Sequence, residues 1–207
     1  MSLKLTEYLQ GGFIAMIKDD QKTAVQAPSD ADPGGSGKTL SKAKTASRLN
    51  ELIVTCKDGE AGYRSASEGV KSAELKALFA ECTIQRAQFV GELQSLVRSL
   101  GGNPEHTGSF IAKLHRGWID IKAAIEGRDE AGVLVECERG ENIAKNAYKT
   151  VLKETLRPHV RAVVERQLGT ITEVHKQIRS LKTAFLAKDK RHLPPPPRQT
   201  KSIGTQP

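Results

Sequence analysis

Aromatic residues are scarce in this sequence, since Phe, Trp and Tyr together make up 4% of its 207 residues. Sustained alternation of apolar and polar residues is missing too, and no Asn-Gly or Asp-Gly turn separates two β-branched runs. These absences argue against a sheet, whereas the many Ala, Leu, Glu, Lys and Arg residues favour helices. The sequence therefore predicts an all-α fold.

Cysteine occurs three times, at Cys56, Cys82 and Cys137. An odd number without a close pair matches neither a disulfide framework nor a zinc site. No apolar run approaches the roughly 20 residues that span a bilayer. The short apolar run at 11–17 lacks the basic flank and the cleavage site of a signal peptide. We therefore expect reduced, buried thiols and a cytoplasmic location.

Composition divides the chain into three parts. Residues 1–46 form an N-terminal extension and flexible linker, residues 47–186 carry long apolar periodicities, and residues 187–207 form a Pro-rich basic tail. This tail has five basic side chains and one acidic side chain. Such a tail can contact nucleic acid or an anionic surface, but a solvated end is the more common explanation.

The central part contains five stretches with apolar residues at steps of three and four, the spacing of one buried helix face. We expect helices over about 47–68, from 73 to 100, over about 109–126, from about 129, and from 158 to about 186. Ser72 is expected to cap the second helix and Pro158 to open the last. The short connections predict a four-helix bundle, with 109–126 as an additional helix inside the crossover.

Several polar residues interrupt the apolar stripes, where an unpaired polar group is costly. One interpretation is a metal centre, because a di-iron bundle uses a Glu from each of two helices and a Glu-x-x-His from each of the other two. The candidate ligands for iron or manganese are Glu60, Glu81, Glu141 and His175, with Glu138 and Gln85 as neighbours. The pattern is incomplete, because Thr172 stands where His175 needs a carboxylate and Gln85 stands in place of a histidine.

The other interpretation is a buried hydrogen-bonded network that needs no cofactor. Glu60, Gln85, Glu141 and His175 would then satisfy one another and fix the register of the helices. The missing second Glu-x-x-His favours this interpretation. It predicts that Glu141→Leu is tolerated, because an apolar group of similar size replaces a buried charge.

Four segments of the chain resemble one known family. They read LNELIVTCKDGEAGYRSA, ELKALFAECTIQRAQF, GSFIAKLHRGWIDIKAAIEGRDEAGVLVECERGE, and VRAVVERQ followed by His175. The resemblance covers about residues 47–183 and is to a bacterial ferritin-like four-helix-bundle family classed as a domain of unknown function.

This resemblance implies a ferritin-like bundle with no established activity, so whether the chain is an enzyme is left open. It favours a structural, interaction or stress-related protein without an intact catalytic site. The alternative is a metal-binding, ferroxidase-like protein that uses carboxylates in the bundle core. Self-association into a homo-oligomer is compatible with either function.

Overall fold

The computed structural model describes residues 39–104, 122–127 and 129–191. Its elements are the helices α2 (Lys42–Gly69), α3 (Ala73–Ser99), α5 (Glu130–Leu152) and α6 (Pro158–Arg191). Residues 122–126 are also helical, and these described ranges contain no strand. The all-α prediction is thus confirmed. Most of the predicted helix over 109–126, residues 1–38 of the N-terminal extension and the prolines of the tail lie outside the described residues.

The helix ends follow the expected capping chemistry. The side chain of Ser72 accepts a hydrogen bond from Leu75 N at 3.3 Å, and Asp129 does the same for Gly132 N at 2.9 Å. Pro158 is the first residue of α6, as predicted. α2 starts earlier than the predicted residue 47, because Ser41 supplies an N-cap that the composition of the linker concealed.

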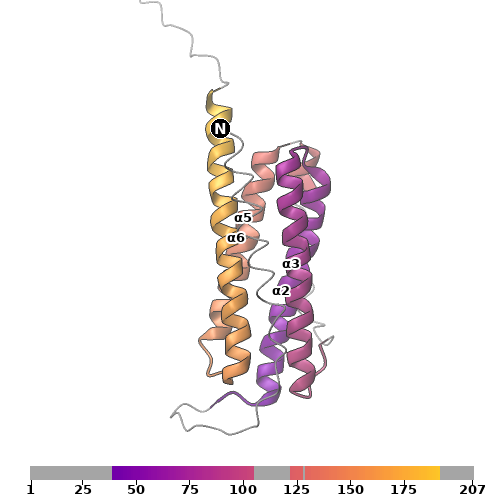
Figure 1. Cartoon of the computed structure of the whole chain (residues 1–207), viewed down its shortest axis with the longest axis vertical. Helices are drawn as coiled ribbons and strands as arrows, with labels where there is room; N and C mark the ends of the chain where they lie inside the picture. Colours follow the sequence, from indigo (N-terminus) through magenta and orange to yellow (C-terminus); the bar gives the residue numbers. More distant parts are fainter. Residues whose placement is uncertain (1–38, 105–121, 128, 192–207) are drawn as a thin grey trace, which may run out of the picture. The chain divides into compact units, whose positions relative to one another are not determined.

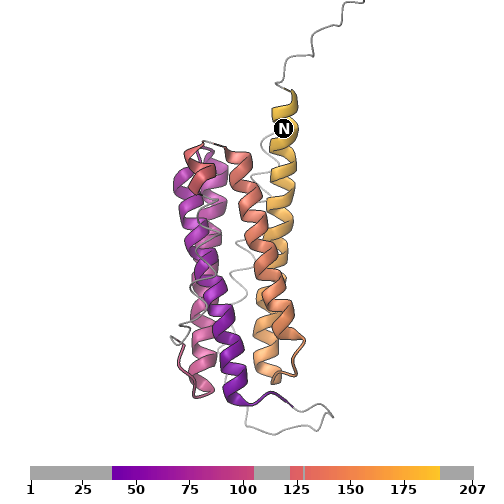
Figure 2. The same cartoon turned by 180° about the vertical axis from the view of Figure 1, so that it is seen from behind.

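The four long helices lie side by side with two reversals of direction (Figures 1 and 2). α2 packs mainly against α3, and α5 packs mainly against α6. α3 and α5 run in the same direction, so the chain between them must return to the opposite end of the bundle (Figure 1). One long crossover between the second and third helices is a feature of ferritin-like folds.

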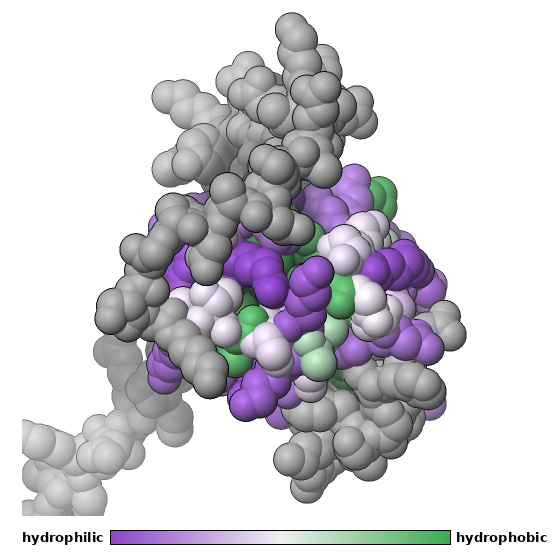
Figure 3. Space-filling model, turned by 90° about the horizontal axis from the view of Figure 1, so that it is seen from below, coloured by the Kyte–Doolittle hydropathy of each residue, from purple (hydrophilic) through white to green (hydrophobic). Residues whose placement is uncertain are grey.

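Hydrogen bonds from loop residues to other loops and to helices hold the helix ends together. At the end where α2 begins, Leu40 N donates to Thr155 O at 2.9 Å, and Asn50 Nδ2 donates to Asn103 O at 3.0 Å. Figure 3 views this end and shows mainly hydrophilic residues around a few apolar ones. At the opposite end, the Glu130 carboxylate accepts from the backbone N–H groups of the turn between α2 and α3.

The predicted apolar stripes line the core, which consists of two clusters. One contains Leu49, Leu52, Phe89, Leu93 and Val160 among others, and the other contains Leu75, Phe79, Leu134 and Ile178 among others. Buried polar side chains accompany these clusters. No helix within the described ranges is long and apolar enough to cross a membrane.

Candidate functional site

Among the described residues, the most deeply buried charges belong to Arg86 on α3 and Glu141 on α5. Their side chains are 1% and 3% exposed, and Arg86 Nη2 forms a short ion pair with Glu141 Oε1. Tyr63 on α2 donates its hydroxyl proton to the same oxygen at 2.6 Å. Three helices therefore converge on one carboxylate oxygen.

The surroundings of Arg86 are shaped to receive its long side chain. A Cβ at Gly59 would lie 3.3 Å from Arg86 Nε, so glycine leaves the space that the guanidinium stem needs. The guanidinium also lies 6.0 Å from the ring centroid of Tyr63 and 5.6 Å from that of Phe89. These distances are typical of cation–π contacts, which gain strength away from water.

Burial alone would lower the pKa of Arg86, but the carboxylate of Glu141 outweighs it and raises that pKa above its ordinary value. For Tyr63, burial and then the negative charge of Glu141 raise the pKa well above the ordinary value. The arginine is therefore a permanent cation, and the tyrosine stays a neutral donor. Neither group can act as a base near neutral pH.

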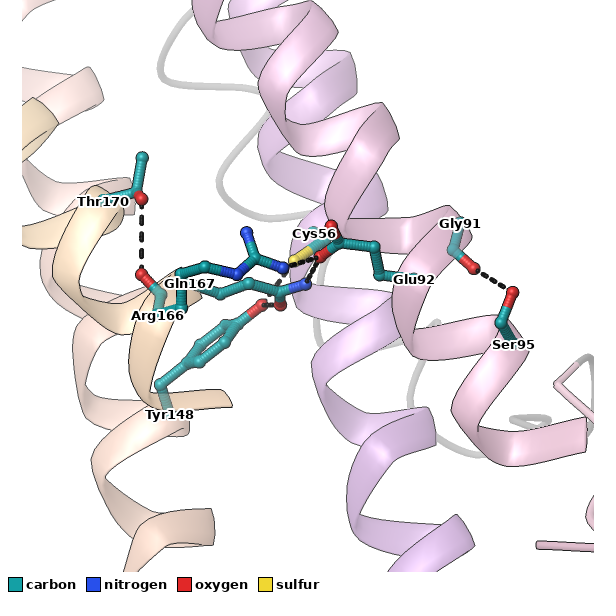
Figure 4. A network of polar contacts seen from close by, with 8 residues as sticks. All are labelled: Cys56, Gly91, Glu92, Ser95, Tyr148, Arg166, Gln167 and Thr170. Carbon is teal, nitrogen blue, oxygen red and sulfur yellow. Dashed lines mark hydrogen bonds and ion pairs between the residues drawn. The ribbon is translucent and has the colours of Figure 1, made fainter. Parts of the chain in front are cut away.

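A second network links all four long helices, as Figure 4 shows. Tyr148 of α5 donates to Gln167 Oε1 of α6 at 2.6 Å, and Gln167 Nε2 donates to Glu92 Oε2 of α3 at 2.6 Å. Arg166 Nη2 reaches the same carboxylate oxygen at 2.7 Å. Because the Tyr148 proton is already donated, the 3.1 Å contact with Cys56 Sγ of α2 requires the thiol to be the donor.

All three cysteines are buried free thiols. Burial raises the pKa of Cys56 to about 11 and also raises the pKa values of Cys82 and Cys137. No Cα of α3 lies within 8 Å of a Cα of α5. Since a disulfide needs Cα atoms closer than about 7 Å, Cys82 and Cys137 cannot be bridged without backbone movement. The expected reduced thiols fit this geometry.

His175 of α6 belongs to a third group of charges. Its Nδ1 lies 3.2 Å from Lys145 Nζ, and its Nε2 lies 3.8 Å from Glu138 Oε1. Glu138 in turn forms a short ion pair with Lys182. Burial and the positive charge of Lys145 lower the pKa of His175, and the bond from Lys182 lowers the pKa of Glu138. The histidine is therefore mainly neutral near neutral pH.

The structure does not gather the candidate metal ligands into one group of three or more within its described residues. Glu60 pairs with Arg64 at 2.5 Å, one turn away on the same helix, and Glu81 is exposed on α3. Glu141 is held by Arg86, and His175 lies among its own charged neighbours. In the described part of the chain, no group of three or more His, Cys, Asp or Glu side chains is placed to hold a metal.

A metal ion therefore does not fit the residues of this core. Oε1 of Glu141 already accepts two donors, while its Oε2 and Arg86 Nη1 are buried without a partner among the described residues. A cation bound to this carboxylate would lie beside a guanidinium that cannot lose its proton. Because Glu141 belongs to no group of three or more possible ligands among the described residues, we derive no metal-dependent step.

Sequence reasoning overlooked Arg86, although a signal for it was present. Arg86 follows Cys82 by four residues and precedes Phe89 by three, so it falls on the apolar stripe of α3. A buried arginine on one helix and a buried glutamate on another are natural partners. Because of this partner, Glu141→Leu is expected to destabilise the protein and not to be tolerated. Leu would leave the buried guanidinium of Arg86 unpaired.

A surface pocket of about 340 Å³ lies near the end of α2 and the start of α5. It is lined in part by Val70, Ile125, Glu130 and Phe185. Glu130 caps the turn between α2 and α3, and Asp129 caps α5. Both acidic side chains therefore already accept hydrogen bonds from backbone N–H groups. The described lining of the pocket offers no paired acid and base.

Comparison with solved structures relates this chain to a two-domain protein from Anabaena variabilis ATCC 29413, which contains DJ-1/ThiJ/PfpI-like and ferritin-like domains. The TM-score is 0.59 at 13% sequence identity, and the match covers 92% of this chain and 52% of that protein. At this identity the likeness shows the fold alone, a ferritin-like bundle. This chain spans about half the length of that neighbour.

None of the curated proteins matches this chain. The family model described as "Domain of unknown function (DUF2383)" matches residues 44–154, which include nearly all of α2 and the whole of α3 and α5. The match covers more than half of the 207 residues. The chain therefore belongs to the DUF2383 family, a domain of unknown function with a ferritin-like fold.

Proposed function

We propose that this protein is a ferritin-like bundle with a structural or interaction role and without a catalytic metal centre. The observation that supports the proposal is the ion pair between Arg86 and Glu141. The guanidinium gives the central carboxylate a compensating positive charge from within the chain. The core is thereby neutralised without a bound cation.

The other acidic candidates also have cationic partners or lie apart. Glu60 is paired with Arg64, and Glu138 is paired with Lys182. A metal that recruited these carboxylates would have to break both ion pairs. It would also leave Arg86 as a buried charge without its partner, which is strongly unfavourable.

A role in a stress response is the more specific part of this proposal, and only the family resemblance supports it. Such a role would need no redox chemistry in the core if the bundle acts by binding other molecules. The rival function, a ferroxidase-like protein that binds iron or manganese, predicts a different stoichiometry of bound metal. The two proposals can therefore be separated by one experiment.

The full-length protein would be incubated anaerobically with ferrous iron, and separately with manganese, then desalted and analysed for metal. We expect less than one retained ion per chain and no acceleration of ferrous iron oxidation over buffer. Glu141→Gln is the matched variant, because it removes the carboxylate charge at nearly constant size. Retention of at least one ion per chain, lost in Glu141→Gln, would overturn the proposal.

A further inference from the structure

The outer face of α3 is unlike the surface of a typical solvated helix. Six of its exposed residues are small or apolar and recur at helical spacing, namely Ala77, Ala80, Ile84, Ala87, Gly91 and Ser95. Ile84 lies at the centre and is 58% exposed, more than any other large apolar residue in the described ranges. A soluble helix normally carries charged residues on this side.

No described helix covers this face. Both Gly91 and Ser95 lie on the side of α3 turned away from Gln167 and the core (Figure 4). A Cβ added at Gly91 would meet no atom within 4 Å, so nothing inside the fold requires a glycine there. Small residues on an exposed helix allow another helix to approach closely.

The charged residues of this face would match those of a second copy whose α3 runs in the opposite direction. Glu81 and Arg98 are charged residues near opposite ends of this face, and the exposed Lys76 lies at its edge, nearer the start of α3. No ion pair joins either of them to another side chain in the part of the chain that the structure describes. Seventeen residues separate them, which is roughly 25 Å along a helix.

We propose that the outer face of α3 binds the same face of a second copy of this chain in an antiparallel, two-fold symmetric pair. An axis between Gln88 and Gly91 places Glu81 of each copy opposite Arg98 of the other. The same register places the bulky Ile84 opposite the small Ser95 and places Gln88 opposite Gly91. One patch thus supplies both halves of the interface, as two-fold symmetry requires.

A parallel pair would instead place like charges together, because Glu81 would face Glu81 and Arg98 would face Arg98. The charge order therefore selects the antiparallel arrangement. A single helix pair buries less than the roughly 1,200–2,000 Å² of a standard stable interface. The dimer is accordingly weak, and its population rises with protein concentration.

The test compares the wild type with the charge reversals Glu81→Arg and Arg98→Glu in the full-length protein. Sedimentation equilibrium at high concentration should give an average mass rising towards twice 22.5 kDa for the wild type. Each reversal alone should give a monomer, because it places like charges opposite each other. An equimolar mixture of the two variants should form a heterodimer, since both ion pairs are then restored.

A second variant tests packing rather than charge. Gly91→Leu fills the space that the partner's helix would occupy, and it should give a monomer with unchanged helicity. Gly140→Leu on α5 is the matched control, because a Cβ at Gly140 also meets no atom within 4 Å. This control should still dimerise.

A wild-type protein that stays monomeric at every concentration would overturn the proposal. Dimers that persist in both charge reversals would overturn it too. A mixture of the two reversals that remains monomeric would exclude the antiparallel register.

Discussion

Arg86 and Glu141 place two opposite charges where a helical bundle usually has apolar side chains. Removing one partner of a buried ion pair costs far more than removing both, because a lone charge then remains in the core. Tyr63 adds a hydrogen bond to the same carboxylate oxygen. The three side chains therefore depend on one another.

Single and double substitutions measure this dependence. We expect Glu141→Leu and Arg86→Met each to lower the free energy of unfolding by about 3–5 kcal/mol. The double variant should lose less than either single variant, because no unpaired charge remains. Urea denaturation followed by far-UV circular dichroism gives the three values.

Glu60→Leu is the control, since Glu60 is partly exposed and its pair with Arg64 is expected to contribute about 1 kcal/mol or less. Ordinary surface substitutions change the free energy of unfolding by at most about 0.5 kcal/mol. Changes as small as this in both Glu141→Leu and Arg86→Met would contradict this description of the core.

The buried thiols give a chemical prediction. Thiolates rather than thiols react with iodoacetamide, and burial raises the pKa of Cys56 to about 11. Native protein at mildly alkaline pH should therefore be alkylated far more slowly than protein unfolded in urea, where all three cysteines should react. Mass spectrometry counts the added groups, and rapid triple labelling of the native protein would argue against the buried positions.

His175 predicts a dependence of stability on pH. Its pKa is lowered in the folded state by burial and by Lys145, while Glu138 and Glu141 oppose the shift and Arg179 adds to it. Below the ordinary histidine pKa of about 6.5, the unfolded chain therefore binds more protons than the folded chain. The stabilisation is present above this pH and is lost as the pH falls through the folded-state pKa.

Unfolding free energies of the wild type and of His175→Gln, measured from neutral pH down to about pH 5, should converge as the pH falls. Parallel curves for the two proteins would show that His175 does not contribute.

Helix ends were the most predictable features at the scale of elements. Ser72, Asp129 and Pro158 mark helix starts in the sequence, because each satisfies or avoids an unpaired N–H group. Gly101 ends α3 with a φ of 78°, in the left-handed region that favours glycine. The start of α2 was missed, since Ser41 lies within a stretch whose composition is typical of a linker.

Alanine substitutions at two glycines distinguish the effect of backbone strain on stability from the effect of helix propensity. Gly101→Ala should lower the free energy of unfolding by roughly 1 kcal/mol, because Ala disfavours the left-handed conformation. Gly140→Ala should raise it by about 0.5–1 kcal/mol, because Gly140 lies inside α5 with open space around its Cα. Thermal melts of both variants give the comparison, and equal shifts in one direction would contradict the assignment of the α3 terminus.

The candidate site was only partly predictable from the sequence. The positions of Glu141, Gln85 and His175 on apolar stripes follow from periodicity, and all three are buried. Their partners do not follow, because pairing depends on the rotation and register of neighbouring helices. The pairings of Arg86 with Glu141 and of Glu92 with Gln167 therefore required the three-dimensional arrangement, although the stripe of α3 already indicated that Arg86 is buried.

At the scale of the whole molecule, two polar networks connect the helices of the bundle. One joins α2, α3 and α5 through Glu141, and the other joins all four long helices through Tyr148 and Gln167. Each polar contact requires a particular register between helices, so a slipped bundle would leave buried groups unsatisfied. The networks thereby favour a single arrangement of the helices.

The central claim is that Arg86, and not a metal ion, neutralises Glu141 in the core. A crystal structure of the protein soaked in manganese, with anomalous diffraction data, tests this claim most directly. We expect the Arg86 guanidinium to lie within hydrogen-bonding distance of Glu141 Oε1, with no anomalous peak near that carboxylate. An anomalous peak within coordination distance of Glu141, with Arg86 turned away from it, would contradict the claim.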